Sequence, residues 1–599
     1  MKQSKIIFTS LIILLSFIIL VQPVLSQENN NLSWPLPFFD DKSTSFNPQN
    51  DLNKDNIATL HQTWMTTLSQ SVIIFGNETT RTTSSPLFVN GIIYFIDRSQ
   101  VLFAVNANDN SILWSALLSV PDTEKYDVGK ENVHMRFISF YKGTIWLIDL
   151  DCSIIGFNAY NGERTTQMPP ETLCGDISLE SNPRNSLTRV ISAPILYKQD
   201  NILIVSPSGL ETNDHSLSYI LGINLETNNI AWKTSLVTSA EENIAHGGGQ
   251  WSIDQEEGIV YIGTGSPIPE WNATYRSGAN TYSNSIIAID ASNGEIIWNY
   301  QTNPHDINGY GCTGNTVLSE IDGKKAIYTA CKNGYLYALD AESGDLIWYF
   351  NPPIVKRMNS ENADFVKTNT YDPNKLWINY PSTEPVIQCP GAFGAVSYNI
   401  ALGYDTIYMT AFNKCSELSV APITNIGDTG VTNISILYEP IGPMNSTLYA
   451  IDASNGEIKW NKFFDEVALT GGLTVSGGLV YLPSPDGNVY AFDSETGSQI
   501  WKRNFGSLGI FFPPLIGATA NGTWSLIQIV AGTPQLHSLG QYSGYLFSFI
   551  PDSDSIDNTI KEPTENVTDY NLIITYSAIA VTIILLTATV LMYYRRSKT

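Results

Sequence analysis

The chain is short of positive charge and lacks the cysteine motifs that bind metal or haem. Lysine and arginine together number 32, against 57 aspartates and glutamates. The six cysteines all lie between Cys152 and Cys415, and none stands in a CxxC or CxxCH arrangement, so neither a zinc site nor a c-type haem is indicated. Between its two ends the chain also lacks helical periodicity, and short alternating apolar runs take its place. We therefore expect an all-β protein.

The first residues have the pattern of a secretory signal. Lys2 and Lys5 are followed by an apolar run from Ile6 to Val21 and then by small residues up to Ser26. This pattern is typical of a signal peptide over residues 1–26, cleaved near Ser26. The rest of the chain is then expected in an oxidising, extracytoplasmic compartment.

The last residues predict a membrane anchor. Residues 572–594 are apolar, and a helix of that length, at roughly 1.5 Å per residue, reaches about 34 Å and crosses a bilayer. Arg595, Arg596 and Lys598 follow, which places the tail of residues 595–599 in the cytoplasm. Residues 552–571 are polar and contain proline, as expected of a stalk. The sequence thus predicts a single-pass type I membrane protein of the plasma membrane or endomembrane system, with its bulk extracellular or lumenal.

The predicted ectodomain is strongly acidic. Without the five basic residues of the two ends it holds 32 − 5 = 27 basic and 57 acidic residues, a net charge of −30. Such a surface argues against nucleic acid as a partner and favours solubility. N-x-S/T sequons predict glycosylation at Asn31, Asn77, Asn272, Asn433, Asn445, Asn521 and Asn566.

The cysteines are expected to form disulfides. Cys312 and Cys331 flank a predicted hairpin that turns at Asp322-Gly323, which favours their pairing. The remaining cysteines are paired only by proximity in the sequence, and other connectivities stay open. These two pairs are Cys152–Cys174 and Cys389–Cys415.

One unit of sequence recurs along the chain and ends in tryptophan. AIDASNGEI occurs at Ala288–Ile296 and again at Ala450–Ile458, and each copy is followed by a tryptophan two positions later. In every copy the tryptophan position lies eight residues after an aspartate or asparagine. The exact copies end at Trp298 and Trp460, looser copies end at Trp114, Trp232, Trp348 and Trp501, and a degenerate copy has Thr166 at the tryptophan position.

The unit predicts two strands joined by a tight turn. Glycine suits the turn because it reaches positive φ without a Cβ clash. The alanine before the aspartate leaves room for a large ring against the strand. A tryptophan that recurs once per unit is best used to dock one unit onto the next. We therefore interpret these tryptophans as structural and not as ligand sites.

Counting the units predicts an eight-bladed β-propeller of four-stranded blades over residues 34–551. An eighth unit begins at Phe512 and lacks its own last strand and tryptophan. Trp64, at the end of a leading segment, has the right surroundings to supply that strand and close the ring. The seven complete units are Pro86–Trp114, Phe137–Thr166, Ala193–Trp232, Gln250–Trp298, Asn315–Trp348, Gly394–Trp460, which contains an insertion, and Gly471–Trp501.

This repeat, A-x-D-x-x-x-G-x-x-x-W, with its lead-in WP…N-x-x-x-L…W, resembles that of the quinoprotein alcohol dehydrogenases and their polyvinyl-alcohol-dehydrogenase-like relatives. The resemblance covers residues 34–551 and is most specific in GGGQWSID…GIVYIGTGSPIPEWN and NSIIAIDASNGEIIWNYQTNPHD. It implies pyrroloquinoline quinone (PQQ) with Ca²⁺ at the propeller axis, where that family oxidises alcohols. No haem motif accompanies it.

The resemblance also implies residues of the cofactor site. Trp251 in GGGQW matches the indole that stacks on the quinone, and Lys332 in CKNG matches the basic residue that reaches the quinone oxygens. Glu211 in SPSGLE and Asn272 in PEWN match ligands of Ca²⁺, which prefers oxygen. Asn272 also opens the sequon Asn-Ala-Thr, so metal binding and glycosylation compete for this one residue.

The sequence departs from the family at the catalytic base. The family's stretch reads roughly P-x-D-x-W-D-aromatic, and here Asp306 keeps the first acidic position while Gly309 stands at the base position. Glycine can neither accept a proton nor bind calcium, and Asp306 or His305 replaces the base only if the loop shifts. The vicinal cysteine pair is missing, and CPGAFGAVSYN lacks the family's His-Asn-Trp stretch.

Two functions therefore stay open, with a purely structural surface protein as a third possibility. The sequence favours a membrane-anchored propeller that has lost dehydrogenase chemistry and binds an extracellular ligand or protein. The alternative is a PQQ- and Ca²⁺-dependent alcohol or polyol dehydrogenase that uses Glu211, Asn272, Trp251 and Lys332 with another base and passes electrons to an external acceptor.

Overall fold

A computed structural model describes most of the predicted propeller. All described residues lie in the first of two compact units, Met1–Asp552, and none lies in the second, Ser553–Thr599. The predicted signal peptide, membrane helix and tail therefore lie outside the described residues, and no helix among those described is long and apolar enough to cross a membrane. The described residues are 33–67, 85–97, 101–118, 137–149, 153–169, 192–206, 218–236, 247–267, 278–321, 323–358, 386–391, 394–396, 399–421, 435–465, 469, 471–506, 510, 512–530 and 545–552.

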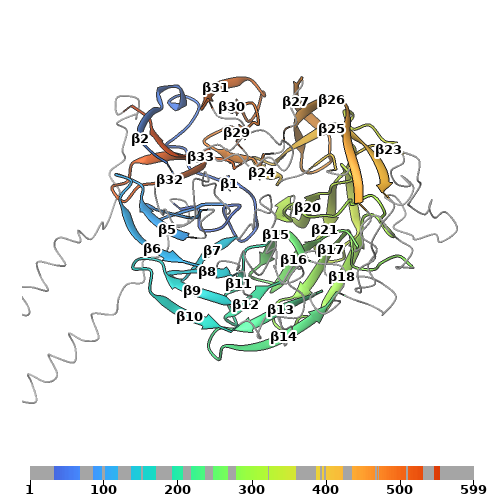
Figure 1. Ribbon diagram of the computed structural model, residues 1–599, viewed down its shortest axis with the longest axis horizontal. Coiled ribbons are helices and arrows are strands. Elements are labelled where there is room, and N and C mark those ends of the chain that lie inside the picture. Colours follow the sequence, from blue (N-terminus) through green and yellow to red (C-terminus); the bar gives the residue numbers. More distant parts are fainter. Residues whose placement is uncertain are drawn as a thin grey trace, which may run out of the picture. The chain divides into compact units, whose positions relative to one another are not determined.

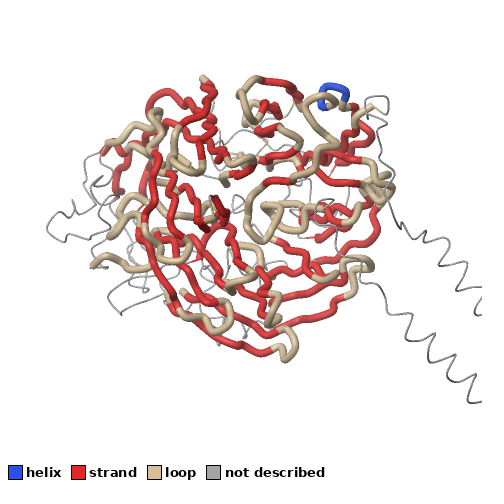
Figure 2. Tube along the Cα trace, turned by 180° about the vertical axis from the view of Figure 1, so that it is seen from behind, coloured by secondary structure: helices blue, strands red, loops and turns tan. Residues whose placement is uncertain are grey.

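The described strands form eight sheets, each built on four antiparallel strands, which confirms the eight-bladed propeller (Figures 1 and 2). We number the blades in chain order and write the innermost strand first. Blade 1 is β3 (Leu87–Val89), β4 (Ile92–Ile96), β5 (Val101–Asn106) and β6 (Ile112–Leu117). Blade 2 is β7 (Ile138–Tyr141), β8 (Thr144–Ile148), β9 (Ile154–Asn158) and β10 (Arg164–Met168). Blade 3 is β11 (Ile195–Tyr197), β12 (Ile202–Val205), β13 (Tyr219–Asn224) and β14 (Asn229–Ser235). Blade 4 is β15 (Gly247–Asp254), β16 (Ile259–Thr264), β17 (Ser285–Asp290) and β18 (Ile296–Gln301).

The second half of the ring repeats this plan with two additions. Blade 5 is β19 (Val317–Ile321), β20 (Lys324–Ala330), β21 (Leu336–Asp340) and β22 (Leu346–Phe350). Blade 6 is β24 (Ala401–Gly403), β25 (Thr406–Ala421), β26 (Ser435–Asp452) and β27 (Ile458–Phe464), and its insertion lengthens β25 and β26 into a hairpin that also pairs with β23 (Val386–Gln388). Blade 7 is β28 (Thr474–Ser476), β29 (Leu479–Pro483), β30 (Asn488–Asp493) and β31 (Gln499–Asn504), with β1 (Phe46–Asn47) added alongside β28. Blade 8 is β32 (Leu515–Ala518), β33 (Trp524–Val530), β34 (Tyr545–Ile550) and β2 (His61–Thr67), which follows a short 3₁₀ helix, η2 (Ile57–Thr59).

The N-terminal strand β2 closes the ring, as Trp64 predicted. It pairs antiparallel with β34, the last described strand, from His61 opposite Ile550 to Thr67 opposite Tyr545. In Figure 1 the blue β2 lies beside the red strands of blade 8. The edge strand that an open sheet would expose at the end of the repeat is thereby paired.

Five of the docking tryptophans reach the next blade through the indole N–H. In each blade the tryptophan lies opposite a small residue of its own sheet, such as Ala288 opposite Trp298. The indole N–H of Trp298 donates to the carbonyl of Ala341 in blade 5 at 3.0 Å, and Tyr261 donates to the same oxygen at 3.2 Å. Four further indoles make the same contact at 2.8–3.0 Å: Trp64 with Ala107, Trp114 with Ala159, Trp232 with Ala291 and Trp460 with Ser494.

The turn glycine has two roles in this contact. Gly344 has φ +76°, which only glycine adopts readily, and a Cβ at this position would come within 2.6 Å of the Trp298 ring. The glycine is therefore required by its own turn and by the tryptophan of the preceding blade. The same closeness relates Gly162 to Trp114, Gly294 to Trp232, Gly456 to Trp348 and Gly497 to Trp460.

Blade 2, which has Thr166 at the tryptophan position, uses a different aromatic ring of its own sheet. Thr166 pairs with Gly156 in the register that the tryptophan has elsewhere. A Cβ on Gly156 would lie 3.0 Å from the ring of Trp146, a residue of β8 that is 6% exposed. A ring from the second strand thus occupies the space beside this blade's third strand.

The antiparallel order divides the connections between two faces of the ring. Turns from the first to the second strand and from the third to the fourth strand share one face, which we call the turn face. Connections from the second to the third strand and from one blade to the next share the other, which we call the loop face. The repeat turns with Asp290 and Asp452 belong to the turn face.

The leading segment, residues 34–47, runs along the inner strands of the whole ring, and we call it the N-terminal girdle. It follows the blades in their order and bonds mainly through backbone carbonyls. Figure 1 shows this blue segment and β1 among the innermost strands. The contacts are Trp34 with Phe88 (blade 1), Pro35 O with Phe140 N (blade 2), Asp41 with Lys198 (blade 3), Asp41 O with Ile253 N (blade 4), Lys42 O with Leu318 N (blade 5), Thr44 O with Leu402 N (blade 6), Ser45 O with Val475 N (blade 7) and Asn47 with Ile516 O (blade 8).

Two neighbouring aspartates of the girdle have different surroundings. The Asp41 carboxylate lies 2.6 Å from Lys198 Nζ and accepts hydrogen bonds from Tyr141 and Gln255, so it joins blades 2, 3 and 4. The Asp40 carboxylate accepts from the backbone N–H of Thr44 at 2.9 Å. Burial raises the pKa of Asp40 to about 6, because the charged form loses its hydration.

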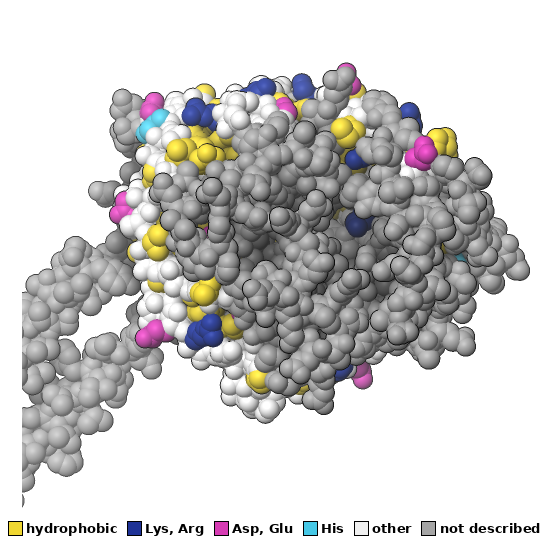
Figure 3. All heavy atoms as spheres, viewed as in Figure 1, with side chains coloured by type: hydrophobic (Ala, Val, Ile, Leu, Met, Phe, Trp, Pro, Cys, Tyr) yellow, Lys and Arg dark blue, Asp and Glu magenta, His cyan; other side chains and the backbone are white. Residues whose placement is uncertain are grey.

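The outer strands expose apolar side chains at several positions, among them the adjacent Ile112 and Leu113 of β6. Ile297, next to the docking Trp298, is 46% exposed. Figure 3 shows such hydrophobic side chains at several separate places on the flank, among charged and neutral polar groups. Scattered exposure of this kind is ordinary for a soluble surface and indicates no docking site.

Substitution of Trp298 tests the docking contact. We expect Trp298→Ala to lower the free energy of unfolding by about 3–5 kcal/mol, because it removes a large ring from the blade interface. Trp298→Phe keeps an aromatic ring and leaves Tyr261 as donor to Ala341, so a loss of about 1 kcal/mol is expected. Denaturant titration followed by circular dichroism measures both, and equal losses would contradict the importance of the ring.

Substitution of Asp40 tests the environment of the girdle. The folded pKa of about 6 lies above the ordinary value of 3.8, so the protonated carboxyl stabilises the fold fully below about pH 4. This contribution is lost as the pH rises through about 6. Asp40→Asn keeps the acceptor for Thr44 and cannot titrate. The free energy of unfolding of the wild type, relative to this variant, is expected to fall between pH 4 and 7, and parallel pH profiles would refute the assignment.

Candidate functional site

The topology places two of the predicted site residues, Asp306 and Lys332, on the loop face. Asp306 lies in the connection from blade 4 to blade 5, and Lys332 follows β20 in blade 5. Trp251 lies on β15, the innermost strand of blade 4. Glu211 and Asn272, the predicted calcium ligands, lie outside the described residues.

Trp251 lies in an irregular part of β15 and is fully buried. The pairing of β15 with β16 shifts between Gly248 and Ser252, so three residues that include Trp251 face a single partner. Its carbonyl accepts a hydrogen bond from Ser43 Oγ of the girdle at 2.6 Å. Its indole Nε1 is buried without a hydrogen-bond partner among the described residues. The girdle thus fixes the backbone of the predicted stacking residue, while its N–H remains available.

Asp306 organises the loop that contains the base position. This loop connects β18 to β19, and we call it the base loop. The Asp306 side chain is 2% exposed, and its carboxylate accepts from the Asn303 amide at 2.8 Å and from the backbone N–H groups of Asn308 at 2.8 Å and Tyr310 at 2.7 Å. Its oxygens are therefore engaged by the loop itself. His305, the other substitute considered from the sequence, lies with Nδ1 2.7 Å from the carbonyl of Gly278.

Gly309 adopts a left-handed backbone at the base position. Its φ is +75°, a conformation that glycine reaches freely and asparagine or aspartate reaches more readily than other residues. The carboxylate of Asp306, three residues earlier, already accepts hydrogen bonds from the backbone N–H groups of its own loop. Gly309 itself has no side chain that could accept a proton. The hydrogen bonds of Asp306 therefore fix the shape of this loop. The loop carries no carboxylate at the position from which the resemblance would have a base remove the hydroxyl proton.

Lys332 is held between two loop-face segments. Its backbone N–H donates to Gly311 O at 3.1 Å, and its carbonyl accepts from Ala395 N at 2.9 Å. Gly394, with φ +75°, packs so closely that a Cβ there would lie 2.6 Å from the Lys332 Cβ. The side chain of Lys332 is half-buried. Its backbone is thus tied to the base loop on one side and to the turn around residue 394 on the other.

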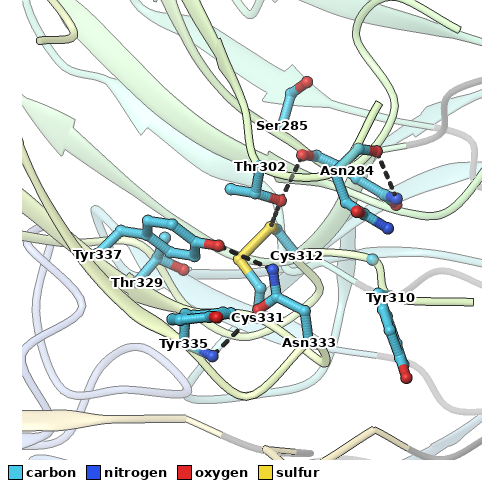
Figure 4. The surroundings of a disulfide bond; sticks show 12 residues. Asn284, Ser285, Thr302, Tyr310, Cys312, Thr329, Cys331, Asn333, Tyr335 and Tyr337 are labelled. Atoms are coloured by element: carbon cyan, nitrogen blue, oxygen red, sulfur yellow. Dashed lines mark hydrogen bonds between the residues drawn. A yellow bond between two sulfur atoms is a disulfide. The ribbon is translucent and has the colours of Figure 1, made fainter. Parts of the chain in front are cut away.

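Two of the three predicted disulfides are present in the described residues. Cys312–Cys331 joins the end of the base loop to the residue before Lys332 (Figure 4). Cys389–Cys415 joins β23 to β25. Cys152 and Cys174 lie outside the described residues. Figure 4 also shows Thr302 directed at Cys312, with Oγ1 3.2 Å from the sulfur, and Tyr310 pointing away from the disulfide.

A group of buried amides beside the base loop was not expected from the sequence. Gln388 is fully buried, and its Nε2 donates to Asn308 O at 3.1 Å and to the Tyr310 hydroxyl at 3.3 Å. Tyr310 in turn donates to Pro390 O at 2.6 Å. The side-chain oxygens of Asn308 and Gln388 are buried without a partner among the described residues. An unpaired buried acceptor costs about 1–3 kcal/mol, so these oxygens are candidates for contact with a ligand or water.

A buried lysine lies next to the same segment. Lys414 on β25 is 6% exposed, and its carbonyl accepts from Gly391 N at 2.8 Å. Burial lowers the pKa of its amine. The signal that would have identified it is a single basic residue inside the otherwise uncharged strand TIYMTAFNKC, directly before Cys415.

The described sequons differ in accessibility. Asn521 is exposed at the first turn of blade 8, as a glycan acceptor must be. Asn445 lies on β26 opposite Asn413, and its side-chain oxygen is buried without a partner among the described residues. Asn31, Asn77, Asn272, Asn433 and Asn566 lie outside the described residues.

The described residues fit part of a PQQ site. Trp251 has an unused indole N–H, although its ring is fully buried in the core cluster that includes Leu36 and Ile253, and Lys332 is half-buried. The predicted calcium ligands, Glu211 and Asn272, are outside the described residues. The described residues thus retain the residue types of the stacking and basic positions, whereas the base position holds no proton acceptor.

Sequence comparison identifies the family. The family described as "Glucose/ethanol/alcohol dehydrogenase, beta-propeller domain" matches residues 34–386, more than half of the chain. Residues 441–510 match the family described as "Outer membrane protein assembly factor BamB". These matches confirm the resemblance drawn from the tryptophan repeat.

Individual relatives agree along most of their length. Quinoprotein alcohol dehydrogenase PedH of Pseudomonas putida is 25% identical over 545 residues, which cover 81% of this chain and 84% of the relative. Methanol dehydrogenase [cytochrome c] subunit 1 of Methylorubrum extorquens is 24% identical, and the match covers 82% of each chain. Among solved structures, quinohemoprotein alcohol dehydrogenase ADHIIG of Pseudomonas putida HK5 has the same fold, with a TM-score of 0.71, 18% identity and coverage of 91% of this chain and 83% of that one.

Replacement of Asp306 tests its structural role. Asp306→Ala leaves three buried donors unpaired, and we expect the free energy of unfolding to fall by about 3 kcal/mol or more. Glu342→Ala, at an exposed repeat turn, is the matched control and is expected to change little. A variant at residue 306 as stable as the wild type would show that the carboxylate does not hold the loop.

Proposed function

The chain belongs to the PQQ-repeat, alcohol dehydrogenase-like β-propeller family, and from this premise we propose that it is a ligand-binding propeller that no longer oxidises alcohols by the family's route. The observation that carries the proposal is the base loop. Gly309 occupies the base position, and the nearby Asp306 carboxylate is engaged by three donors of its own loop. Positioned proton transfer typically contributes 10²–10⁴-fold to a rate, so its loss removes most turnover and leaves binding intact.

The retained residues support binding at the axis. Trp251 would stack on a flat ring, and Lys332 would face its anionic oxygens. Glu211 and Asn272 would hold Ca²⁺ through oxygen, as the resemblance implies. PQQ, when bound, accepts a hydride from an alcohol whose hydroxyl proton is removed by a base. Trp251 and Lys332 orient such a ligand, and neither of them removes that proton.

A working dehydrogenase is the second candidate. Trp251, Lys332 and the family membership favour it, provided that another group accepts the proton. In that case an alcohol or polyol is the substrate and an external acceptor takes the electrons, as proposed from the sequence. Turnover by the unmodified protein distinguishes this candidate from the first.

The location of the protein is part of the proposal. We propose that residues 1–26 direct secretion and that residues 572–594 anchor the propeller in a membrane with the ligand site outside the cytoplasm. The two disulfides between described cysteines support an oxidising compartment. Glycosylation at exposed Asn521 is expected in the same setting, and peptide mapping of Asn521 and Asn272 checks both acceptors.

Restoring the base is the direct test. The full-length protein, purified in detergent, is incubated with PQQ and Ca²⁺, and quenching of tryptophan fluorescence measures binding while alcohol-dependent dye reduction measures turnover. We expect the wild type to bind without turnover and Gly309→Asp to gain turnover of about 10²-fold or more. Gly309→Asn is the matched control, since it has the same size and backbone tolerance but no basic group.

Each outcome separates the candidates. Binding by all three proteins, with turnover only in Gly309→Asp, supports the proposal. Turnover by the wild type overturns it in favour of the dehydrogenase. Absence of PQQ binding by the wild type overturns an axial PQQ site altogether. Trp251→Phe and Lys332→Met are expected to weaken quenching if these two residues contact the ligand.

A further inference from the structure

We propose that the guanidinium of Arg357 binds an anionic oxygen group of a small ligand, a carboxylate or a phosphate, on the loop face between blades 5 and 6. Arg357 lies between β22 and β23, and it is not among the residues to which the resemblance gives a role. The site goes beyond the proposed function, because it requires neither PQQ nor Ca²⁺.

Three described groups hold the guanidinium of Arg357 in place. Nε and Nη2 donate to Asn351 Oδ1 at 3.3 and 3.0 Å, and Nη1 donates to the carbonyl of Asn333 at 2.7 Å. The central carbon, Cζ, lies 3.9 Å from the centre of the Tyr335 ring. A guanidinium that is stacked on an aromatic ring and bonded at its edge has little freedom left to lose when a ligand binds. Arg357 is therefore preorganised.

These contacts leave part of the guanidinium available to a ligand. Arginine carries five N–H donors, and the bonds to Asn351 and Asn333 use three of them. One N–H on Nη1 and one on Nη2 therefore make no hydrogen bond to a described residue. The Arg357 side chain is half-buried, so it remains accessible from solvent. Arginine recognises carboxylate and phosphate oxygens with N–H groups held in this way.

No carboxylate neutralises this charge within the described part of the chain. Arg357, the exposed Lys356 beside it and the half-buried Lys332, which precedes Asn333, form no ion pair there. Three positive charges thus belong to one region of an otherwise acidic protein, and their combined potential favours an anion. The described ion pairs involve Lys54, His61, Lys198, Lys325 and Lys459 instead.

The turn that presents Asn333 and Tyr335 to the guanidinium is itself fixed. The Asn333 side-chain oxygen accepts from Tyr335 N at 3.1 Å, as Figure 4 shows. Cys331 N donates to the carbonyl of Tyr335 at 3.1 Å, and the disulfide with Cys312 ties the turn to the base loop. The acceptor and the ring that hold Arg357 are therefore part of a rigid support, as a binding group requires.

Chemical modification of the wild type tests the site. The full-length protein in detergent is treated with phenylglyoxal, which modifies accessible guanidinium groups, and peptide mass mapping measures the rate at Arg357. Succinate, inorganic phosphate or chloride is present at equal ionic strength. We expect succinate or phosphate to slow the modification about fivefold or more relative to chloride, because their oxygens accept from the unused N–H groups. The anion that protects identifies the ligand group as carboxylate or phosphate.

Arg164 is the matched control for this measurement. It is exposed, and its Cζ lies 5.6 Å from the centre of the Phe157 ring, so it is also an arginine above an aromatic ring. We expect phenylglyoxal to modify Arg164 at the same rate in all three solutions.

Variants separate the charge from its positioning. Arg357→Gln is expected to weaken binding of the protecting anion about tenfold or more by isothermal titration calorimetry, because hydrogen bonds to charged groups contribute most. Arg164→Gln removes the same charge elsewhere and is expected to leave the affinity unchanged. Asn351→Ala keeps Arg357 but frees its edge, and the anion concentration for half-protection is expected to rise about threefold, since the guanidinium must then be ordered on binding.

Three results would overturn the inference. Equal protection of Arg357 and Arg164, or protection by chloride as strong as that by the other anions, would reduce the effect to charge screening. Absence of protection by both succinate and phosphate would leave Arg357 as a structural link between the end of β22 and the turn after β20. None of these measurements involves PQQ or the turnover of Gly309→Asp, so failure of the anion site can be told from failure of the proposed function.

Discussion

The propeller depends on a closure made by its own N-terminus. β2 completes blade 8 against β34, and the girdle bonds to all eight blades in their order. The same segment supplies Trp64, whose indole donates to Ala107 of blade 1 and so docks the last blade onto the first. Without residues 34–67 the last blade would lack a strand and the inner strands would lose the backbone acceptors that connect them. The tryptophan contacts set the spacing between neighbouring blades, and the N-terminal segment links all eight blades to one another.

The antiparallel order of the strands puts two kinds of residue on opposite faces of the ring. The turn face carries the repeated aspartates and glycines that form the docking units. The loop face carries Trp251, Lys332, Lys414 and the base loop, where each blade differs from the others. The girdle contacts both sets, since Ser43 bonds to the carbonyl of Trp251 while Asp41 joins three blades. The site residues are therefore positioned by backbone bonds to a segment far away in the sequence.

Features that depend on the sequence repeat could be predicted, whereas contacts made by single residues became visible only in the structure. Blade number and closure through Trp64 followed from the repeat, and the pairing of Cys312 with Cys331 followed from the hairpin that the two cysteines flank. The girdle was not foreseen, since backbone carbonyls from almost any residue make its bonds. The engagement of Asp306 by its own loop also left no pattern, because two of its three donors are backbone N–H groups. A site built from single residues on separate loops has no period to detect.

The girdle also has a consequence for the order of folding. Asn47 bonds to Ile516, and His61 pairs with Ile550, so the first described segment of the propeller to be synthesised is completed by the last blade to be made. Contacts this distant in the chain are slow to form, because the intervening loop must lose its freedom before they contribute. During synthesis from the N-terminus the early blades must persist as an open arc whose inner strands still lack partners. An arc of this kind exposes strand edges and apolar surface, which is the condition that chaperones relieve.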